Sequence, residues 1–109
     1  MTKTLIYKTD DGPLSFIEDI HEGDVQEYRD NDTLVYLVDH EKEVILDVSK
    51  LNDNDSYIVC HYSGKQGEYH HAAIRNRKET IMSRMESGRY KEGVFFYKFD
   101  KDRYKSVAN

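Results

Sequence analysis

Hydrophobic residues in this chain fall in short runs separated by polar turns, the pattern of strands with a few helices between them. Alternation over residues 3–8 predicts a first strand. Residues 33–38, 56–62 and 94–99 are rich in β-branched and aromatic side chains, which favour strands. The pattern therefore predicts a β-sheet to which segments from most of the chain contribute strands.

The middle of the chain is typical of a β-meander. The polar residues 39–42 separate the strand at 33–38 from a second apolar run at 43–48, as in a hairpin. Another polar cluster then precedes the strand at 56–62. Residues 24–28 are a further candidate strand that would pair ahead of 33–38.

Two segments have helical spacing. Pro13 is suited to a first helical position, and Leu14, Ile17 and Ile20 recur every three residues. This spacing predicts a short helix over 13–21, and a strand across 14–20 is the alternative.

The longer helix is predicted over residues 68–86. Ile74, Ile81 and Met85 lie on one helical face, and Gly88 is a suitable residue just beyond a helix C-terminus. Residues 101–109 are polar, and we expect a frayed tail from about 101. Together these elements predict one α+β domain over 1–109: a mainly antiparallel sheet with a short N-terminal helix and a longer C-terminal helix.

Composition narrows the functional classes. The 109 residues are 34% charged and 38% hydrophobic, with one cysteine. Such a chain has no apolar run long enough for a membrane span, and it cannot form an internal disulfide. The start of the sequence has no signal-peptide pattern, so we expect a cytoplasmic protein. Exposed strand edges are compatible with a dimer.

The net charge of −5 conceals two blocks of opposite sign. Residues 1–60 carry 15 acidic and 5 basic side chains, a balance of −10. Residues 61–109 carry 11 basic and 6 acidic side chains, a balance of +5. This asymmetry indicates a charged partner, unless the two blocks neutralise each other across the fold.

The acidic block supports the first functional hypothesis, a small interaction protein of the regulator, inhibitor or immunity type. Its carboxylates would bind a basic partner protein, with an affinity that falls as salt rises. The candidate partner-binding residues are Glu18, Asp19, Glu22, Asp24 and Glu27.

The basic block supports a nucleic-acid-binding alternative. Cations alternate with aromatic rings along the C-terminal part of the chain, and such residues contact phosphates and stack on bases. The candidate residues are Arg84, Arg89, Lys91, Lys98 and Arg103. The overall pI of about 5.5 is lower than is usual for this class.

A second alternative is a small enzyme that processes phosphodiesters or nucleotides. Residues 61–71 combine histidines with a glycine loop, and imidazoles transfer protons near neutral pH. The candidate catalytic residues are His61, His70, His71 and Arg75. The loop lacks the full P-loop pattern, and the sequence has no zinc-binding spacing. We therefore expect no metal and no cofactor.

Overall fold

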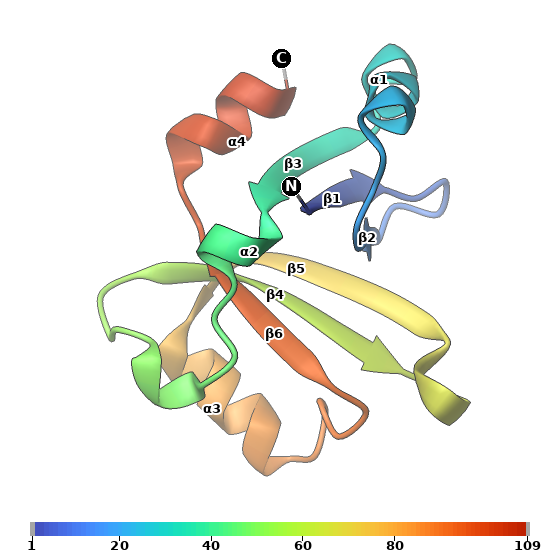
Figure 1. Cartoon of the computed structure of the whole chain (residues 1–109). Helices are drawn as coiled ribbons and strands as arrows, with labels where there is room; N and C mark the ends of the chain where they lie inside the picture. Colours follow the sequence, from blue (N-terminus) through green and yellow to red (C-terminus); the bar gives the residue numbers. More distant parts are fainter. Residues whose placement is uncertain (1, 109) are drawn as a thin grey trace.

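A curled antiparallel sheet of six strands forms the centre of the protein (Figure 1). The computed structural model describes the backbone of residues 2–108 and the side chains of residues 2–104. Along the sheet the strands follow the order β3-β1-β2-β5-β4-β6. Their bounds are β1 (Lys3–Lys8), β2 (Leu14–Ile17), β3 (Leu34–Asp39), β4 (Ser56–Ser63), β5 (Tyr69–Arg77) and β6 (Val94–Lys98).

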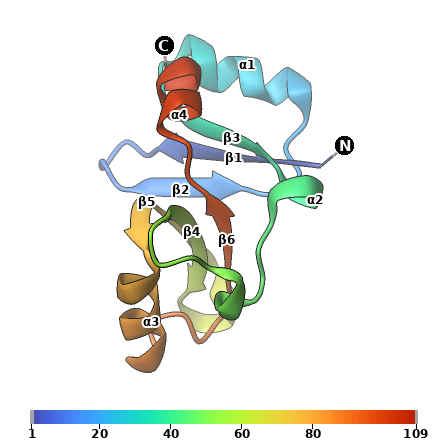
Figure 2. The same ribbon diagram turned by 90° about the vertical axis from the view of Figure 1, so that its left-hand side faces the viewer.

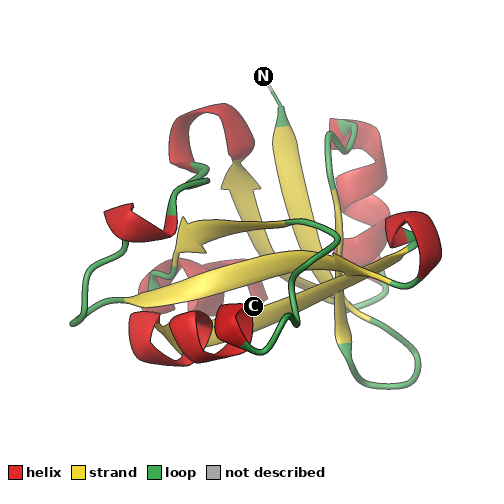
Figure 3. Ribbon diagram, turned by 90° about the horizontal axis from the view of Figure 1, so that it is seen from below, coloured by secondary structure: helices red, strands yellow, loops and turns green. Residues whose placement is uncertain are grey.

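The sheet consists of two three-stranded halves that meet at a narrow joint. β2 and β5 share one paired position, Leu14 opposite Ala72. Beside it, the Ser15 hydroxyl donates a 2.7 Å hydrogen bond to the carbonyl oxygen of His70. Because so few bonds hold the halves together here, the strands of one half cross those of the other (Figure 3).

The helices lie around this sheet. α1 and α3 are at opposite ends of the molecule in both side views (Figures 1 and 2). α1 contacts β3, α3 contacts β5, and α4 packs on β3. The helical segments are α1 (Glu22–Asp30), α2 (His40–Glu43), α3 (Lys78–Glu86) and α4 (Lys101–Ala108), with single 3-10 turns at η1 (Val48–Lys50) and η2 (Lys65–Gly67).

Alternation along the strands fills three cores. Ile58 and Cys60 of β4 point into the central core enclosed by the curl. Val59, between them, points the other way, into a core that contains Ile81 of α3. The sheet is therefore apolar on both faces in this half, which explains the uninterrupted hydrophobic run in β4.

The predicted helix over 13–21 is wrong, and its alternative is closer. Residues 14–17 form β2, which pairs with β1 from Leu5 opposite Ile17 to Lys8 opposite Leu14. Phe16 is buried in the central core. The spacing of three between Leu14 and Ile17 is therefore not the period of a helix.

Two predicted strands are also wrong. Residues 24–28 lie within α1, whose acidic first turn and basic last turn complement the helix dipole. Residues 43–48 begin at the end of α2 and contribute only an isolated bridge between Ile45 and Phe96. The middle of the chain is therefore not a meander, because β3 pairs with β1 and not with the segment that follows it.

The predicted helix over 68–86 is correct only in its second half. Residues 69–77 form β5, which pairs with β4 along most of its length, and α3 begins at Lys78. The predicted frayed tail is helix α4, and Asn109 lies outside the described residues. The four strands predicted over 3–8, 33–38, 56–62 and 94–99 are confirmed.

Candidate functional site

The strongest candidate site is a pocket of about 440 Å³ between the β4–β5 hairpin and the C-terminal end of α3. His61 of β4 and His71 of β5 lie directly opposite each other in the strand register. Their ring centroids are 5.2 Å apart. The polar residues that line this pocket, called the basic pocket below, are His61, Ser63, His71, Arg84, Arg89 and Tyr90.

Strand alternation selects the histidines that face the pocket. His61 and Ser63 are two residues apart on β4, so they point to the same face of the sheet. Ser63 Oγ lies 2.8 Å from His71 Nε2, a hydrogen bond that fixes the orientation of the His71 ring. The hairpin thus presents two imidazoles and a hydroxyl on the side of α3.

A C-terminal helix motif brings the other half of the pocket into place. Gly88 has φ +79°, a left-handed conformation that glycine adopts without strain. Its N–H bonds to Met85 O, and the Arg89 N–H bonds to Arg84 O, which is the Schellman pattern. The chain reverses there, so Arg89 and Tyr90 return toward β4, and the Tyr90 ring centroid lies 5.0 Å from that of His61.

The two arginines give the pocket its positive charge. Arg84 Nη1 donates a 3.2 Å hydrogen bond to Oδ1 of the buried Asn76. Neither Arg84 nor Arg89 makes an ion pair with any side chain of residues 2–104. Both guanidinium charges are therefore available to an anion that enters the pocket.

Burial and positively charged neighbours change the pKa of His61. Burial lowers its pKa, and His71, Arg89 and Arg84 lower it further, so its imidazole is uncharged at neutral pH. Its Nδ1 and the Tyr90 hydroxyl are both buried without a hydrogen-bond partner among the described residues. Tyr90 itself is only 6% exposed. Unsatisfied polar atoms at such depth are rare, and here both belong to residues that line one pocket.

A second hollow of about 380 Å³ continues from the basic pocket. The two share Ser63 and Arg89, and the second adds the cations Lys65 and Lys91 together with Glu92. A ligand that carries several negative charges would therefore contact more cations than the basic pocket alone provides.

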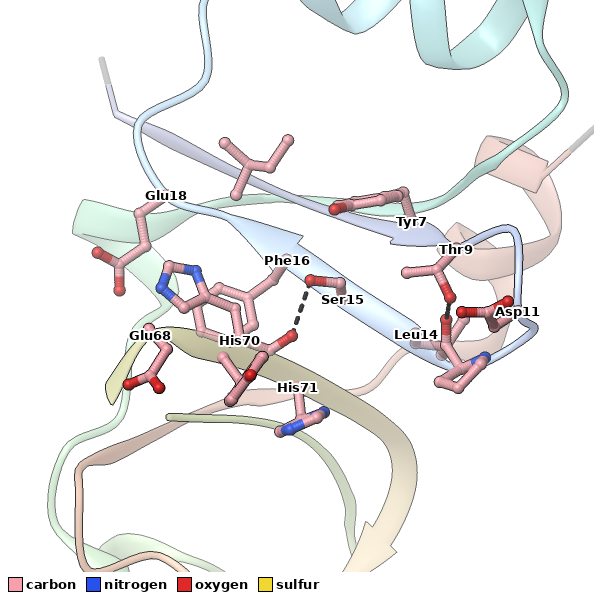
Figure 4. Close-up of a pocket in the computed structure, with 13 residues that line it drawn as sticks. Tyr7, Thr9, Asp11, Leu14, Ser15, Phe16, Glu18, Glu68, His70 and His71 are labelled. Atoms are coloured by element: carbon pink, nitrogen blue, oxygen red, sulfur yellow. Dashed lines mark hydrogen bonds between the residues drawn. The ribbon is translucent and has the colours of Figure 1, made fainter. Parts of the chain in front are cut away.

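Two of the predicted catalytic residues lie elsewhere. His70 points to the opposite face from His71, and its ring stacks on Phe16 with centroids 5.0 Å apart. It lines a different cleft of about 780 Å³ beside β2, together with Glu18 and Glu68 (Figure 4). Arg75 has φ +61° at the irregularity between β4 and β5, and its guanidinium lies 5.3 Å from the centroid of the Phe99 ring. His71 lies between the two cavities and lines both of them. The basic pocket thus contains His61 and His71 but neither His70 nor Arg75.

Four of the predicted acidic partner-binding residues lie in α1 or in the turn before it, whereas Glu18 lies in the cleft beside β2. Asp24 and Glu27 are exposed on α1, while Glu22 pairs with Lys3 at 3.5 Å. Asp19 has φ +52° in the turn before α1. Glu18 accepts a hydrogen bond from the Tyr62 hydroxyl, and burial together with this carboxylate raises the pKa of Tyr62.

The predicted nucleic-acid-binding residues divide into two groups. Arg84, Arg89 and Lys91 line the basic pocket and its continuation. Lys98 instead pairs with Asp55 at 3.8 Å. Arg103 is bound to Glu43 and donates a 2.6 Å hydrogen bond to Leu37 O, so it attaches α4 to the sheet.

Sequence reasoning missed that the histidines and the arginines belong to one site. Ser63, Asn76 and Tyr90 were not among its site residues, although each positions or lines the pocket. The usable signal was Gly88, because a left-handed residue after α3 reverses the chain and returns the next two side chains to the sheet. Among the residues described, no group of three or more His, Cys, Asp or Glu is placed to hold a metal ion.

Comparisons with protein-family models, with curated proteins and with solved structures found no match to this chain. None of the helices in the described part of the chain is long and apolar enough to cross a membrane.

Proposed function

We propose that this protein binds single-stranded nucleic acid through its basic pocket. The observation that carries the proposal is the convergence of Arg84 and Arg89, neither ion-paired within the described chain, on a pocket that also contains His61 and His71. Guanidinium groups bind phosphate oxygens in a bidentate manner, and imidazoles add hydrogen bonds. This supports a phosphate-bearing ligand.

The second hollow favours a polymer over a single nucleotide. Arg89 lines both cavities, and Lys65 and Lys91 continue the line of cations. A backbone with regularly spaced phosphates would occupy both. The exposed ring of Tyr69, which lies beside Gly64 of the second hollow and also lines the cleft beside β2, offers a surface for base stacking. The net charge of −5 opposes non-specific binding, so the local cations have to supply the affinity.

Fluorescence anisotropy with short labelled single strands of RNA and DNA tests this proposal. At low salt we expect both to bind, and we expect Arg84→Ala combined with Arg89→Ala to weaken binding at least about tenfold. Each lost phosphate contact should also lower the salt slope by about 1. Lys98→Ala is the matched control, because Lys98 lies outside the pocket and should leave the affinity unchanged. Absence of binding, or equal loss in the control, would reject the proposal.

A second candidate function follows from the separation of charge. α1 and α3 lie at opposite ends of the molecule, so exposed acids on α1 are not neutralised by the basic pocket (Figures 1 and 2). This supports the binding of a basic protein through the acidic end. Asp24→Lys with Glu27→Lys is a clean test, because neither residue makes an ion pair with the described side chains.

If the acidic end binds a basic protein, the wild-type chain should capture that protein after nuclease treatment. The variant with Asp24→Lys and Glu27→Lys should not capture it. A control with Arg84→Ala and Arg89→Ala should capture it normally, because those residues belong to the other end. Retention of the same protein by the charge-reversed variant would reject the acidic end as the binding surface.

A further inference from the structure

The two histidines of the basic pocket are placed to do more than bind phosphate. They are opposed across β4 and β5 with ring centroids 5.2 Å apart, so a single phosphate group can contact both. Proton transfer requires a side-chain atom within about 2.6–3.2 Å of the reacting oxygen. Two imidazoles on one strand pair, facing one pocket, supply the two groups that such a step needs, a general base and a general acid.

The two imidazoles also have different surroundings. His61 is partly buried beside Arg84 and Arg89, and its lowered pKa leaves it uncharged and able to accept a proton. His71 is exposed, and Ser63 Oγ holds its Nε2. A third group that orients an imidazole in this way is a recurring feature of acid–base pairs in enzymes.

We infer that His61 and His71 cleave the RNA backbone by general base and general acid catalysis, an inference that rests on the proposed binding of nucleic acid in the same pocket. His61 takes the proton of a ribose 2′-hydroxyl, whose oxygen forms a bond to the adjacent phosphorus. The bond from phosphorus to the 5′-oxygen of the next nucleotide breaks, and protonated His71 gives its proton to that oxygen. The products are a 2′,3′-cyclic phosphate and a free 5′-hydroxyl.

Atoms and charges balance in this step without a co-reactant. The nucleophile belongs to the substrate, one proton enters the protein at His61 and one leaves from His71. Arg84 and Arg89 offset the additional negative charge that develops on the non-bridging oxygens as phosphorus becomes five-coordinate. DNA lacks the 2′-hydroxyl, so it should bind in the pocket and stay intact.

The experiment compares a labelled RNA oligonucleotide with the same strand in DNA and with an RNA that carries one 2′-deoxy nucleotide. We expect the RNA to be cut to products with 2′,3′-cyclic phosphate ends, identified by mass spectrometry, with or without a chelator. The DNA should stay intact, and the 2′-deoxy position should resist cleavage. His61→Gln and His71→Gln should each reduce the rate about a hundredfold or more.

His70→Gln, purified in the same way, is the control, because its side chain lies in the other cleft. It should cut RNA at the wild-type rate, and circular dichroism should show every variant folded. Binding of RNA and DNA without cleavage would overturn the inference and leave the proposed function standing. Cleavage that persists in both His61→Gln and His71→Gln would also overturn it. Absence of any binding would reject the proposed function itself.

Discussion

His61 and His71 face each other across the β4–β5 hairpin on the side of the sheet that α3 covers, whereas His70, one residue away, faces Phe16 on the other side. The strand period of two makes this separation unavoidable. A helix over the same residues would have placed His70 and His71 about 100° apart on one surface. Recognition of β5 as a strand therefore changes which histidine can cooperate with His61.

The lowered pKa of His61 predicts a specific pH dependence of stability. Because the folded chain holds this imidazole uncharged, it binds fewer protons than the unfolded chain at pH values just below the ordinary histidine value of 6.5. The free energy of unfolding should therefore fall as the pH drops through this window. In His61→Gln the fall should be smaller. Urea denaturation at a series of pH values measures both.

The control for this prediction is His21→Gln, at an exposed position before α1. It should keep the wild-type pH dependence. If His61→Gln has the same slope as the wild type, the burial of His61 does not govern the response.

The strands of the central core could be predicted from sequence because their side chains alternate between two apolar environments. β5 could not be, since most of its side chains are polar and partly or fully exposed and only Asn76 is buried. Its strand conformation comes from pairing with β4, a contact distant in sequence that overrides the local preference. Ile74 and Ile81 happen to share a helical spacing although one lies on β5 and the other on α3.

α1 was missed for a different reason. Its only buried residue is Val25, so the segment has too few apolar residues to show the spacing of a helix. The usable signals were the acids in the first turn and Arg29 in the last, which complement the helix dipole. As for the site, the sequence supplied His61, His71, Arg84 and Arg89 in separate hypotheses, and only the fold brings them together.

Gly88 should be required for both stability and the shape of the basic pocket. Its φ of +79° costs about 1–2 kcal/mol for a residue with a side chain, so Gly88→Ala should lower the free energy of unfolding by that amount. The control is Gly23→Ala within α1, where a methyl group meets no atom and glycine weakens the helix. It should raise stability by about 0.5–1 kcal/mol. Changes of the same sign in both variants would contradict the role of Gly88.

Arg103 should contribute to stability and not to nucleic-acid binding. Its bonds to Glu43 and to Leu37 O join α4 to β3, and its guanidinium lies 5.1 Å from the centroid of the Tyr36 ring. Because the Arg103–Glu43 pair is partly exposed, Arg103→Met should lower the free energy of unfolding by about 1–2 kcal/mol. This is less than the full contribution of a charged hydrogen bond. Lys98→Met removes an exposed pair and should cost less than about 0.5 kcal/mol. If Arg103→Met and Lys98→Met are equally stable in thermal denaturation, this assignment is contradicted. Weaker binding of RNA by Arg103→Met than by the wild type would contradict it too.

A buried hydroxyl network joins the two halves of the fold at Tyr97. Its hydroxyl donates a 2.9 Å hydrogen bond to Thr4 Oγ1 of β1 and lies 2.7 Å from His40 Nδ1. Tyr97→Phe should cost about 1–3 kcal/mol, because it leaves buried polar atoms without a partner. Thr4→Val removes the other end of the same bond. The free energy of unfolding lost in the double variant should therefore be smaller than the sum of the two single losses, by about 0.5 kcal/mol or more.

Tyr90→Phe is the matched control for this network. It removes the same atom from another buried tyrosine whose hydroxyl has no partner among the described residues, so it should be neutral or slightly stabilising. Denaturation in urea at constant pH compares the four variants with the wild type. Additive costs for Tyr97→Phe and Thr4→Val, or a loss in Tyr90→Phe equal to that in Tyr97→Phe, would show that the hydroxyl network does not hold the two halves together.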